Sequence, residues 1–202
     1  MSVLELSPDA AGRLRAAVGV AYSKAAARPE DSHAFPLGRV FAESLGYPAD
    51  LLNRLSPEAV DAFTGVSNVA VFAEIPPGAR VLDLGCGAGT DSLIAAIRTG
   101  PTGRVVGIDF SAAMLARASR AAAGTGLRVA WCRADAERLP LVDASVDVAL
   151  VNGIFNLNPA RAAIFRQLAR VVRPGGTAYA AELILREPRS HPTEVSEAEW
   201  FG

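Results

Sequence analysis

The sequence predicts an α/β fold in which helices cover both faces of a doubly wound parallel sheet. From residue 76 onward, short apolar runs alternate with stretches of helical periodicity. Strands that are apolar on both faces and are separated by helices are typical of a parallel sheet buried between helical layers. Right-handed crossovers between such strands give a doubly wound arrangement. We therefore expect two zones, a helical segment over residues 1–75 and a sheet-forming domain over residues 76–202.

The first 75 residues are expected to be helical. Leu14, Val18 and Tyr22 recur at the spacing of one helix face. Further along, Ser56 followed by Pro57 is typical of a helix N-cap and the first helical position. No stretch of this zone alternates apolar and polar residues in the way that predicts a strand.

The second zone is expected to contain five strands joined by helical crossovers. The predicted strands are residues 80–84, 104–109, 128–133, 146–151 and 177–185. The predicted helices are residues 90–98, 111–123 and 159–172.

The overall charge gives no reason to expect nucleic acid or an anionic membrane as a partner. Twenty Lys and Arg residues stand against 21 Asp and Glu residues, for a net charge of -1. Charged residues interrupt the first 20 positions, and no apolar run reaches the ~18 residues of a membrane span. We expect a cytoplasmic protein.

The cysteines and histidines do not predict a metal site or a disulfide framework. The chain has two cysteines, Cys86 and Cys132, and two histidines, His33 and His191. They are scattered along the sequence and lack the spacing of metal ligands.

A glycine-rich turn follows the first predicted strand and opens a helix. Gly85, Gly87 and Gly89 allow a ligand to approach the backbone closely. The dinucleotide fingerprint requires glycine where Thr90 stands, so it is not met. Asp83, inside the strand, suits an ammonium group better than a pyrophosphate, and this argues against a nicotinamide dinucleotide.

Two further acids follow the next two strands. Asp109 ends the second strand, where a carboxylate can accept hydrogen bonds from both hydroxyls of a ribose. Asp135 follows the third strand and can pair with an adenine amino group. Because the carboxyl ends of parallel strands meet at one edge, the three acids predict a single nucleoside-binding site.

With these segments placed, the chain resembles the class I S-adenosylmethionine (SAM)-dependent methyltransferases. Residues 81–90, 106–114, 135–140, 147–152 and 173–176 are similar to the successive motifs of that family, in the expected order. The resemblance implies a Rossmann-like sheet with an N-terminal helical lid. It implies SAM as cofactor, S-adenosylhomocysteine as product, and a small-molecule methyl acceptor.

The resemblance also assigns the parts of the cofactor to individual residues. The methionine moiety is assigned to Asp83, Gly85, Cys86, Gly87 and Thr90. The ribose is assigned to Asp109, and the adenine to Phe110, Met114, Asp135 and Ala136. Asn152, at the end of the fourth strand, is expected near the reacting methyl group.

Within that family, residues 35–39, 63–68, 89–92 and 152–159 resemble the arsenite methyltransferase group. The group carries an arsenic-binding cysteine near the end of the fourth strand, where this chain has Gly153. The group's N-terminal thiol is absent too, and its further C-terminal cysteine would fall beyond Gly202. Trivalent arsenic is soft and is bound by two or three thiolates, so the departure argues against arsenite as acceptor.

The family fold continues after the fifth strand with a helix and strands six and seven, which the five predicted runs do not include. The fifth strand is then expected at an edge, with Leu183 and Ile184 in its exposed row. We expect either a shortened chain or a homodimer that covers this edge.

Candidates for the acceptor side are Tyr22, His33, Asn152 and Asn156. Tyr22 lies on the lid helix or packs on the core, whereas His33 lies in a loop that can equally be surface. Glu182, unusual in an apolar run, points toward the site or emerges at the sheet edge. Besides a methyltransferase, a SAM-binding module without turnover and a nicotinamide-dependent oxidoreductase remain as alternatives.

Overall fold

A computed structural model describes residues 8–184 of the chain. The described N-terminal part contains helices joined by loops and no strand. The long α1 (Pro8–Ala27) is followed by four short helices, α2 (Arg39–Ser44), α3 (Ala49–Leu52), α4 (Pro57–Val60) and α5 (Val69–Phe72). The predicted cap at Ser56 is present, since its hydroxyl accepts a hydrogen bond from the Glu58 amide at 3.2 Å.

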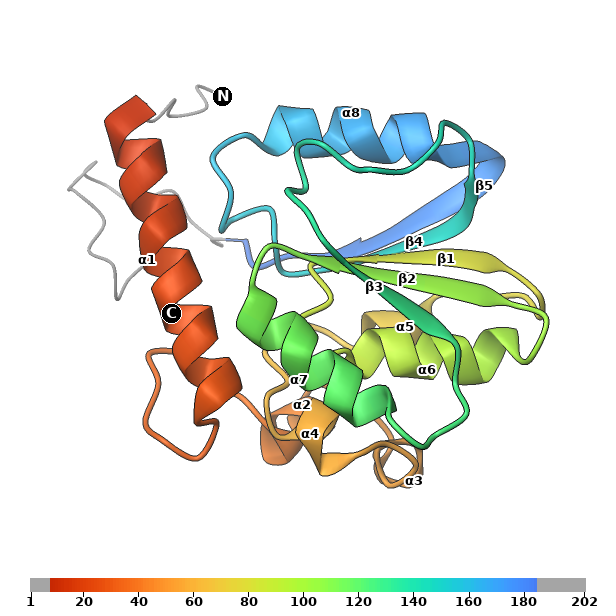
Figure 1. The fold of residues 1–202 in the computed structure, drawn as a ribbon, viewed down its shortest axis with the longest axis horizontal. Coiled ribbons are helices and arrows are strands. Elements are labelled where there is room, and N and C mark those ends of the chain that lie inside the picture. Colours follow the sequence, from red (N-terminus) through yellow and green to blue (C-terminus); the bar gives the residue numbers. More distant parts are fainter. Residues whose placement is uncertain (1–7, 185–202) are drawn as a thin grey trace.

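The rest of the described chain forms the predicted doubly wound sheet (Figure 1). The elements are β1 (Arg80–Leu84), α6 (Thr90–Thr99), β2 (Arg104–Asp109), α7 (Ala112–Ala122), β3 (Val129–Arg133), β4 (Val146–Asn152), α8 (Arg161–Val171) and β5 (Val172–Ala181). All neighbouring strands pair in parallel, in the order β3-β2-β1-β4-β5. The predicted fold class is confirmed.

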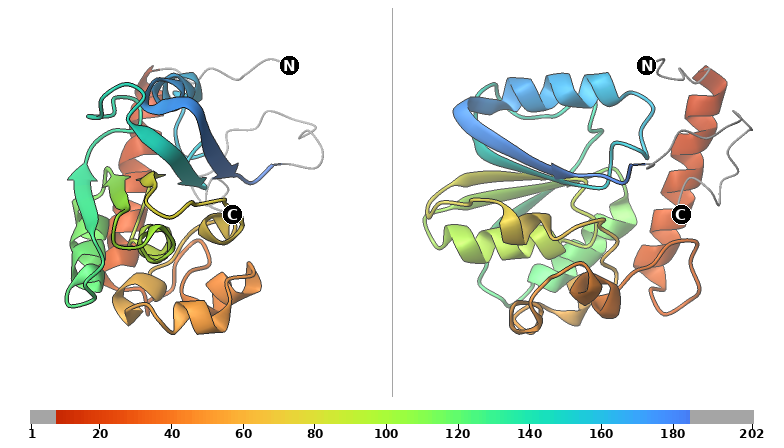
Figure 2. Two further views of the ribbon diagram at one scale, coloured as in Figure 1. Left: turned by 90° about the vertical axis from the view of Figure 1, so that its right-hand side faces the viewer. Right: turned by 180° about the vertical axis from the view of Figure 1, so that it is seen from behind.

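The strand order places a topological switch point in the middle of the sheet. The chain leaves β1 toward β2 on one side and later returns to β4 on the other side. Figures 1 and 2 show α8 on one face of the sheet and α5, α6 and α7 on the other, with α1 standing across one end. In open sheets of this type, ligands bind outside the carboxyl ends of the strands at the switch point.

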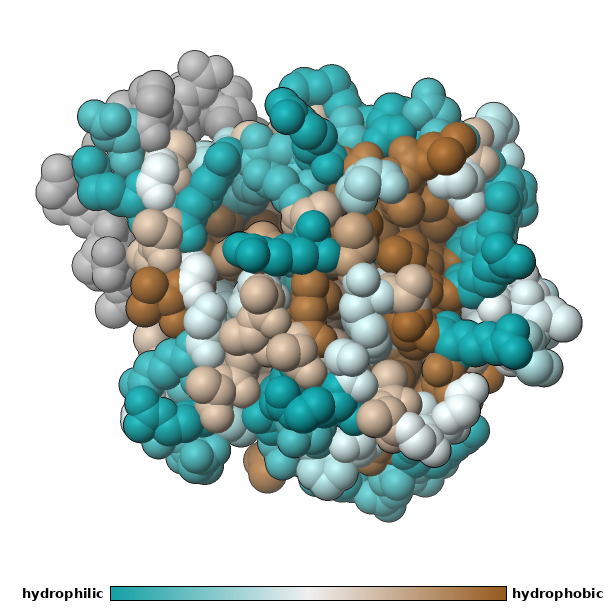
Figure 3. Space-filling view, viewed as in Figure 1, coloured by the Kyte–Doolittle hydropathy of each residue, from teal (hydrophilic) through white to brown (hydrophobic). Residues whose placement is uncertain are grey.

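Each face of the sheet has its own core because successive strand residues point to opposite sides. Val81 and Leu150 pack with α5 and α6 residues such as Leu93. Leu82 and Val151 pack on the other face with α8. In Figure 3 the hydrophobic colouring is concentrated on the β3 side of the sheet, between the two helical layers.

The fifth strand differs from its prediction. It begins at Val172, directly after α8, and not at residue 177. Val172 pairs with Val146, but Thr177 already pairs with Val148, so a bulge containing Gly175 (φ 76°) takes up the extra residues. The pattern of apolar residues could not reveal this, since residues 173–176 are polar, proline and glycine.

Strand β5 starts earlier than predicted and ends at Ala181. The prediction that Leu183 and Ile184 lie in its exposed row is therefore wrong. These side chains are 57% and 88% exposed, but they follow the strand and do not lie in its row. Leu185, the last residue of the predicted run, lies outside the described residues. No strand within residues 8–184 pairs with the outer edge of β5. A homodimer that covers this edge stays a prediction.

Among residues 8–184, no helix is both long and apolar enough to cross a bilayer.

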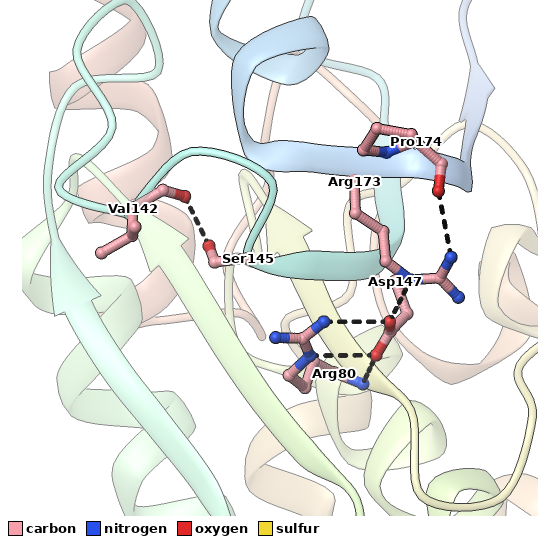
Figure 4. Close-up of polar contacts among 6 residues, drawn as sticks. All are labelled: Arg80, Val142, Ser145, Asp147, Arg173 and Pro174. Atoms are coloured by element: carbon pink, nitrogen blue, oxygen red, sulfur yellow. Dashed lines mark hydrogen bonds and ion pairs between the residues drawn. The ribbon is translucent and has the colours of Figure 1, made fainter.

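An ionic cluster joins β1, β4 and β5 at the amino ends of the strands, away from the switch-point edge (Figure 4). Asp147 Oδ2 accepts hydrogen bonds from the Arg80 backbone amide at 2.6 Å and from Arg80 Nε at 3.2 Å. Asp147 Oδ1 accepts one from Arg173 Nε at 2.6 Å. The two guanidinium groups hold the pKa of the Asp147 carboxyl well below its usual range.

We predict that Asp147→Asn lowers the free energy of unfolding by about 1 kcal/mol at neutral pH, as for a charge-assisted pair at the surface. A carboxyl whose pKa is lowered in the folded state stabilises it above the unfolded pKa of about 3.9. The difference between wild type and variant should therefore be constant above about pH 5 and shrink as the pH falls below about 4, in urea titrations.

Asp143→Asn is the matched control, because Asp143 also pairs with an arginine but its side chain is 75% exposed. Its effect should stay within about 0.5 kcal/mol. An equal effect of both substitutions would contradict a special role for the cluster.

Candidate functional site

A cavity of about 190 Å³ lies at the carboxyl ends of the strands, at the switch point. Its floor is the end of β1 with the glycine loop, residues 83–88. Its sides come from the turn after β2, the loops after β3 and β4, and residues 62–65 of the N-terminal segment. Helix α1 lies across it and contributes Arg15, Val18 and Tyr22. The cavity is thus enclosed by segments from both zones of the chain.

The glycine loop requires glycine at each of its three glycine positions. Gly85, Gly87 and Gly89 have φ values of 76°, 51° and 90°, in the left-handed region that other residues rarely adopt. A Cβ atom on Gly85 would lie 2.3 Å from the Cγ2 of Ile154, and one on Gly89 would lie 2.7 Å from the Trp131 ring. The sequence predicted no role for Trp131, whose ring lies close to Gly89 of the loop.

Asp83 is almost completely buried at the base of the cavity. Its Oδ2 accepts a hydrogen bond from the Ser92 hydroxyl at 2.5 Å. Burial, together with the nearby Asp91 carboxylate, raises the pKa of Asp83 to about 8. In the absence of a cation beside it, this carboxyl is therefore largely protonated at neutral pH.

The two other predicted acids line the same cavity. Asp109 accepts hydrogen bonds from the backbone amides of Gly87 at 2.9 Å and Ser111 at 2.8 Å. Burial raises the pKa of its carboxyl, and these amides oppose that effect. Asp135 accepts a bond from the Glu137 amide at 3.0 Å. The three carboxylates that the sequence singled out thus face one cavity, and their contacts with a cofactor stay a prediction.

Most of the other residues assigned to the cofactor also reach the cavity. Its lining includes Gly85, Cys86, Gly87, Thr90, Phe110, Ala136 and Asn152. Met114 is an exception, because its fully buried side chain packs with alanines of α1 and of the glycine loop and is not part of the cavity lining. The hydroxyl of Thr90 donates to the carbonyl of Ala59 at 3.0 Å and so ties the start of α6, directly after the glycine loop, to α4.

Of the acceptor-side candidates, Tyr22 and Asn152 line the cavity, and His33 and Asn156 do not. His33 Nε2 lies 2.8 Å from the Arg28 carbonyl oxygen in its own loop. Asn156 Nδ2 donates to the Leu183 carbonyl at 2.6 Å. The His33 side chain is therefore engaged within its own loop, and the Asn156 side chain with the segment after β5.

Tyr22 is stacked on Phe35, with ring centroids 4.9 Å apart. Burial raises the pKa of its phenol far above the usual range, and the negative charges of Asp109 and Glu182 add to this effect. Glu182 follows β5 and accepts a hydrogen bond from the Asn156 amide at 3.1 Å. The phenol stays protonated at neutral pH and can donate a hydrogen bond.

Sequence reasoning missed two charged residues of the site. Asp91, the second residue of α6, lines the cavity and is buried. In the sequence it resembles an acid that compensates the helix dipole, so no signal distinguished it. Arg15 of α1 forms an ion pair with Glu137 of the loop after β3. This pair connects α1, for which a lid role stays a prediction, to the loop that carries Asp135.

Thiols are scarce around the cavity. Among the described lining residues the only cysteine is Cys86, whose pKa is raised well above its usual value by burial. Gly153 has a φ of 80°, and a Cβ atom there would lie 2.9 Å from Val66 Cγ1. No group of three or more potential metal ligands occurs within residues 8–184.

Comparison with known proteins gives the site its context. A family profile described as a methyltransferase domain matches residues 81–176. An arsenite methyltransferase of Halobacterium salinarum is 35% identical over 148 residues, which are 73% of this chain and 38% of that protein. The crystal structure of an arsenic (III) S-adenosylmethionine methyltransferase from Chlamydomonas reinhardtii matches with a TM-score of 0.55 and 28% identity, over 73% of this chain and 49% of that one.

The chain belongs to the class I SAM-dependent methyltransferases. The predicted family is confirmed, and SAM is the cofactor of that family. A 2-phytyl-1,4-naphtoquinone methyltransferase of Synechococcus elongatus is also similar, with 40% identity over 56% of this chain and 49% of that protein. This methyltransferase chain thus spans less than half the length of these three relatives.

The geometry at Gly153 of this methyltransferase leads to a stability prediction. Gly153→Ala should lower the free energy of unfolding by about 2–4 kcal/mol, because it adds a left-handed φ cost of about 1–2 kcal/mol to a collision with Val66. Chemical denaturation measures the difference.

Gly124→Ala is the matched control. Gly124 has a φ of 73° but open space where the Cβ atom would lie, so it carries the backbone cost alone. If both substitutions destabilise equally, Val66 does not restrict position 153.

Proposed function

We propose that this protein transfers a methyl group from SAM to a small-molecule acceptor that is uncharged and largely apolar. The observation that carries the proposal is that Asp83, Asp109 and Asp135, from the ends of three successive strands, line one cavity. The family and its relatives support the cofactor assignment.

The chemistry of the cavity suits the cofactor. SAM carries an ammonium group and, when bound, supplies a methyl group on a cationic sulfonium. Asp83 and Asp91 place buried carboxyls at the base of the cavity, where a cation would find a partner. Asp109 would hold the ribose hydroxyls, and Asp135 with Ala136 the adenine edge.

The acceptor side of the cavity favours an apolar molecule. Val18, Phe63, Ile154 and Leu157 supply apolar lining there. Tyr22 of α1 adds an aromatic side chain to the cavity lining. A hydroxyl acceptor would release its proton to solvent when it is methylated. The protein's contribution to catalysis is then to orient the acceptor, which can supply up to about 7–11 kcal/mol. The naphthoquinone methyltransferase among the relatives is consistent with such an acceptor.

An arsenic substrate is disfavoured despite the arsenite methyltransferases among the relatives. Trivalent arsenic requires two or three thiolates. The cavity offers Cys86 alone among its described lining, buried in the glycine loop and with a raised pKa. At position 153 this chain has glycine, and both its backbone conformation and Val66 oppose a side chain there.

The experiment is a calorimetric titration followed by a methylation panel. The chain should bind S-adenosylhomocysteine and not NAD, and Asp109→Ala should weaken that binding at least tenfold because the ribose loses its acceptor. With radiolabelled SAM, label should move to reduced menadione or to a phenol and not to arsenite with glutathione.

Each other outcome supports a different conclusion. Binding without transfer to any acceptor would favour a SAM-binding module without turnover. Binding of NAD in place of S-adenosylhomocysteine would favour an oxidoreductase. Transfer to arsenite would overturn the apolar acceptor.

The affinity for S-adenosylhomocysteine should depend on pH because of Asp83, whose pKa is raised to about 8 without ligand. The ionised carboxylate is the form that attracts an ammonium group, so affinity for S-adenosylhomocysteine should rise as the pH rises through that value. The gain between pH 7 and pH 8.5 should be about eightfold, measured by calorimetry.

Asp83→Asn should bind more weakly and show a flat profile over this range. Asp135→Asn is the control that keeps the slope, because Asp83 is intact in it. A slope that survives in Asp83→Asn would assign the titration to another group.

A further inference from the structure

A buried hydrogen-bonded unit connects α6, β4 and the N-terminal segment beside the cavity. Tyr47 Oη donates to Asp91 Oδ1 at 2.5 Å, and Asn152 Nδ2 donates to Asp91 Oδ2 at 2.9 Å. Asn152 Nδ2 also lies 3.3 Å from Tyr47 Oη. Tyr47 and Asp91 are 2% and 6% exposed, so these contacts are shielded from water.

The same unit holds the backbone of residues 66 and 67. Asn152 Oδ1 accepts hydrogen bonds from the amides of Val66 at 2.8 Å and Ser67 at 3.1 Å. The carbonyl of Ser67 accepts from Asn152 Nδ2 at 2.7 Å, and Tyr47 Oη lies 3.1 Å from it. Both ends of the Asn152 amide are therefore committed to protein groups.

The electrostatics keep the donors and acceptors in these roles. Burial and the Asp91 carboxylate raise the pKa of the Tyr47 phenol well above its usual value, so it remains a donor. Burial raises the pKa of Asp91, while the bonds from Tyr47 and Asn152 favour its ionised form. Because a buried charge without donors is costly, the unit is most stable when all three side chains are in place.

The backbone held in this way leads directly into the cavity lining. Phe63, Thr64 and Gly65, which immediately precede the anchored amides, form one wall of the cavity. Gly153 and Ile154, which follow β4, also line the cavity. The two segments are in close contact, since a Cβ atom on Gly65 would lie 2.5 Å from Asn152 Nδ2. A small displacement of residues 64–67 would thus change the width of the cavity at this wall.

We infer that Tyr47, Asp91 and Asn152 are positioning residues that set the width of the acceptor half of the cavity by anchoring residues 64–67 to the end of β4. Asn152 then acts through this wall and not at the reacting methyl group, where the family resemblance places it. The inference rests on the proposed function in one respect: this half of the cavity is taken to be the half that binds the methyl acceptor.

The first test separates anchoring from cofactor binding in Asn152→Ala. Amide hydrogen exchange at Val66 and Ser67 should accelerate at least tenfold, because both amides lose their acceptor. The Gly87 amide, bonded to Asp109, should be unchanged. The dissociation constant for S-adenosylhomocysteine should stay within threefold of wild type.

The second test uses reduced menadione as the acceptor probe. Tyr47→Phe removes one hydroxyl and keeps the ring packed against Phe63, whose centroid is 5.0 Å away. Its KM for the probe should rise at least fivefold while kcat changes less than threefold, because the wall is misplaced but the methyl donor is not. The control Tyr179→Phe lies on β5 outside the cavity lining and should leave both constants unchanged.

A rescue experiment tests the pairing of Asp91 with Asn152. Asp91→Asn leaves one side-chain oxygen for the two donors Tyr47 and Asn152, and Asn152→Asp places two carboxylates face to face, so each single variant should raise KM. The double variant exchanges donor and acceptor across the 2.9 Å contact and should recover at least half of the loss on a logarithmic scale. Recovery is expected to be incomplete because the Ser67 carbonyl loses one donor.

The outcomes distinguish this inference from the proposed function. If Asn152→Ala weakens S-adenosylhomocysteine binding more than tenfold with unchanged exchange at Val66 and Ser67, Asn152 contacts the cofactor and the inference is overturned. If wild type transfers no methyl group but the exchange result holds, the proposed function fails and the anchoring stands. Additive losses in the double variant would overturn the pairing.

Discussion

The structure depends on the burial of three carboxylates in one cavity. Asp83, Asp91 and Asp109 are each less than 10% exposed and come from β1, α6 and β2. Like charges brought together out of water destabilise the fold unless donors or a cation compensate them. Hydroxyl, amide and backbone donors provide part of this compensation, and protonation of Asp83 at neutral pH provides another part. A cation bound beside these acids would favour their ionised forms and would stabilise the fold.

The helical segment before the sheet completes this site. Arg117 of α7 is buried and donates to the carbonyls of Ala26 at 3.0 Å and Glu58 at 2.6 Å, so the end of α1 and the start of α4 are fixed on the sheet-forming domain. The other end of α1 reaches the loop after β3 through the Arg15–Glu137 ion pair. The lid helix is anchored firmly at one end and by an exposed pair at the other. Between these two anchors, Val18 and Tyr22 of α1 line the cavity that the carboxylates also line.

Periodicity accounts for the success of the fold prediction and also for its failure at β5. The limits of β1 and β2 follow from apolar runs bounded by charged or glycine residues, and both strands match their predicted ranges. The bulge at residues 173–176 is not marked by a pattern of apolar residues. It arises from the register of two neighbouring strands, in which Val146 pairs with Val172 but Val148 pairs with Thr177. Such a register is a property of two strands together, so a one-dimensional pattern does not contain it.

The sequence by itself determined the sheet, the glycine loop and the three acids at strand ends, because backbone periodicity and the parallel connection rule act locally along the chain. Only the tertiary structure decided which side chains share a cavity. It brought Tyr47, Asp91 and Asn152 together across 105 positions of sequence. It also placed Met114 in a hydrophobic cluster outside the cavity lining. Hydrogen bonds between distant segments depend on where the backbone places them, and residue type and spacing carry no information about that placement.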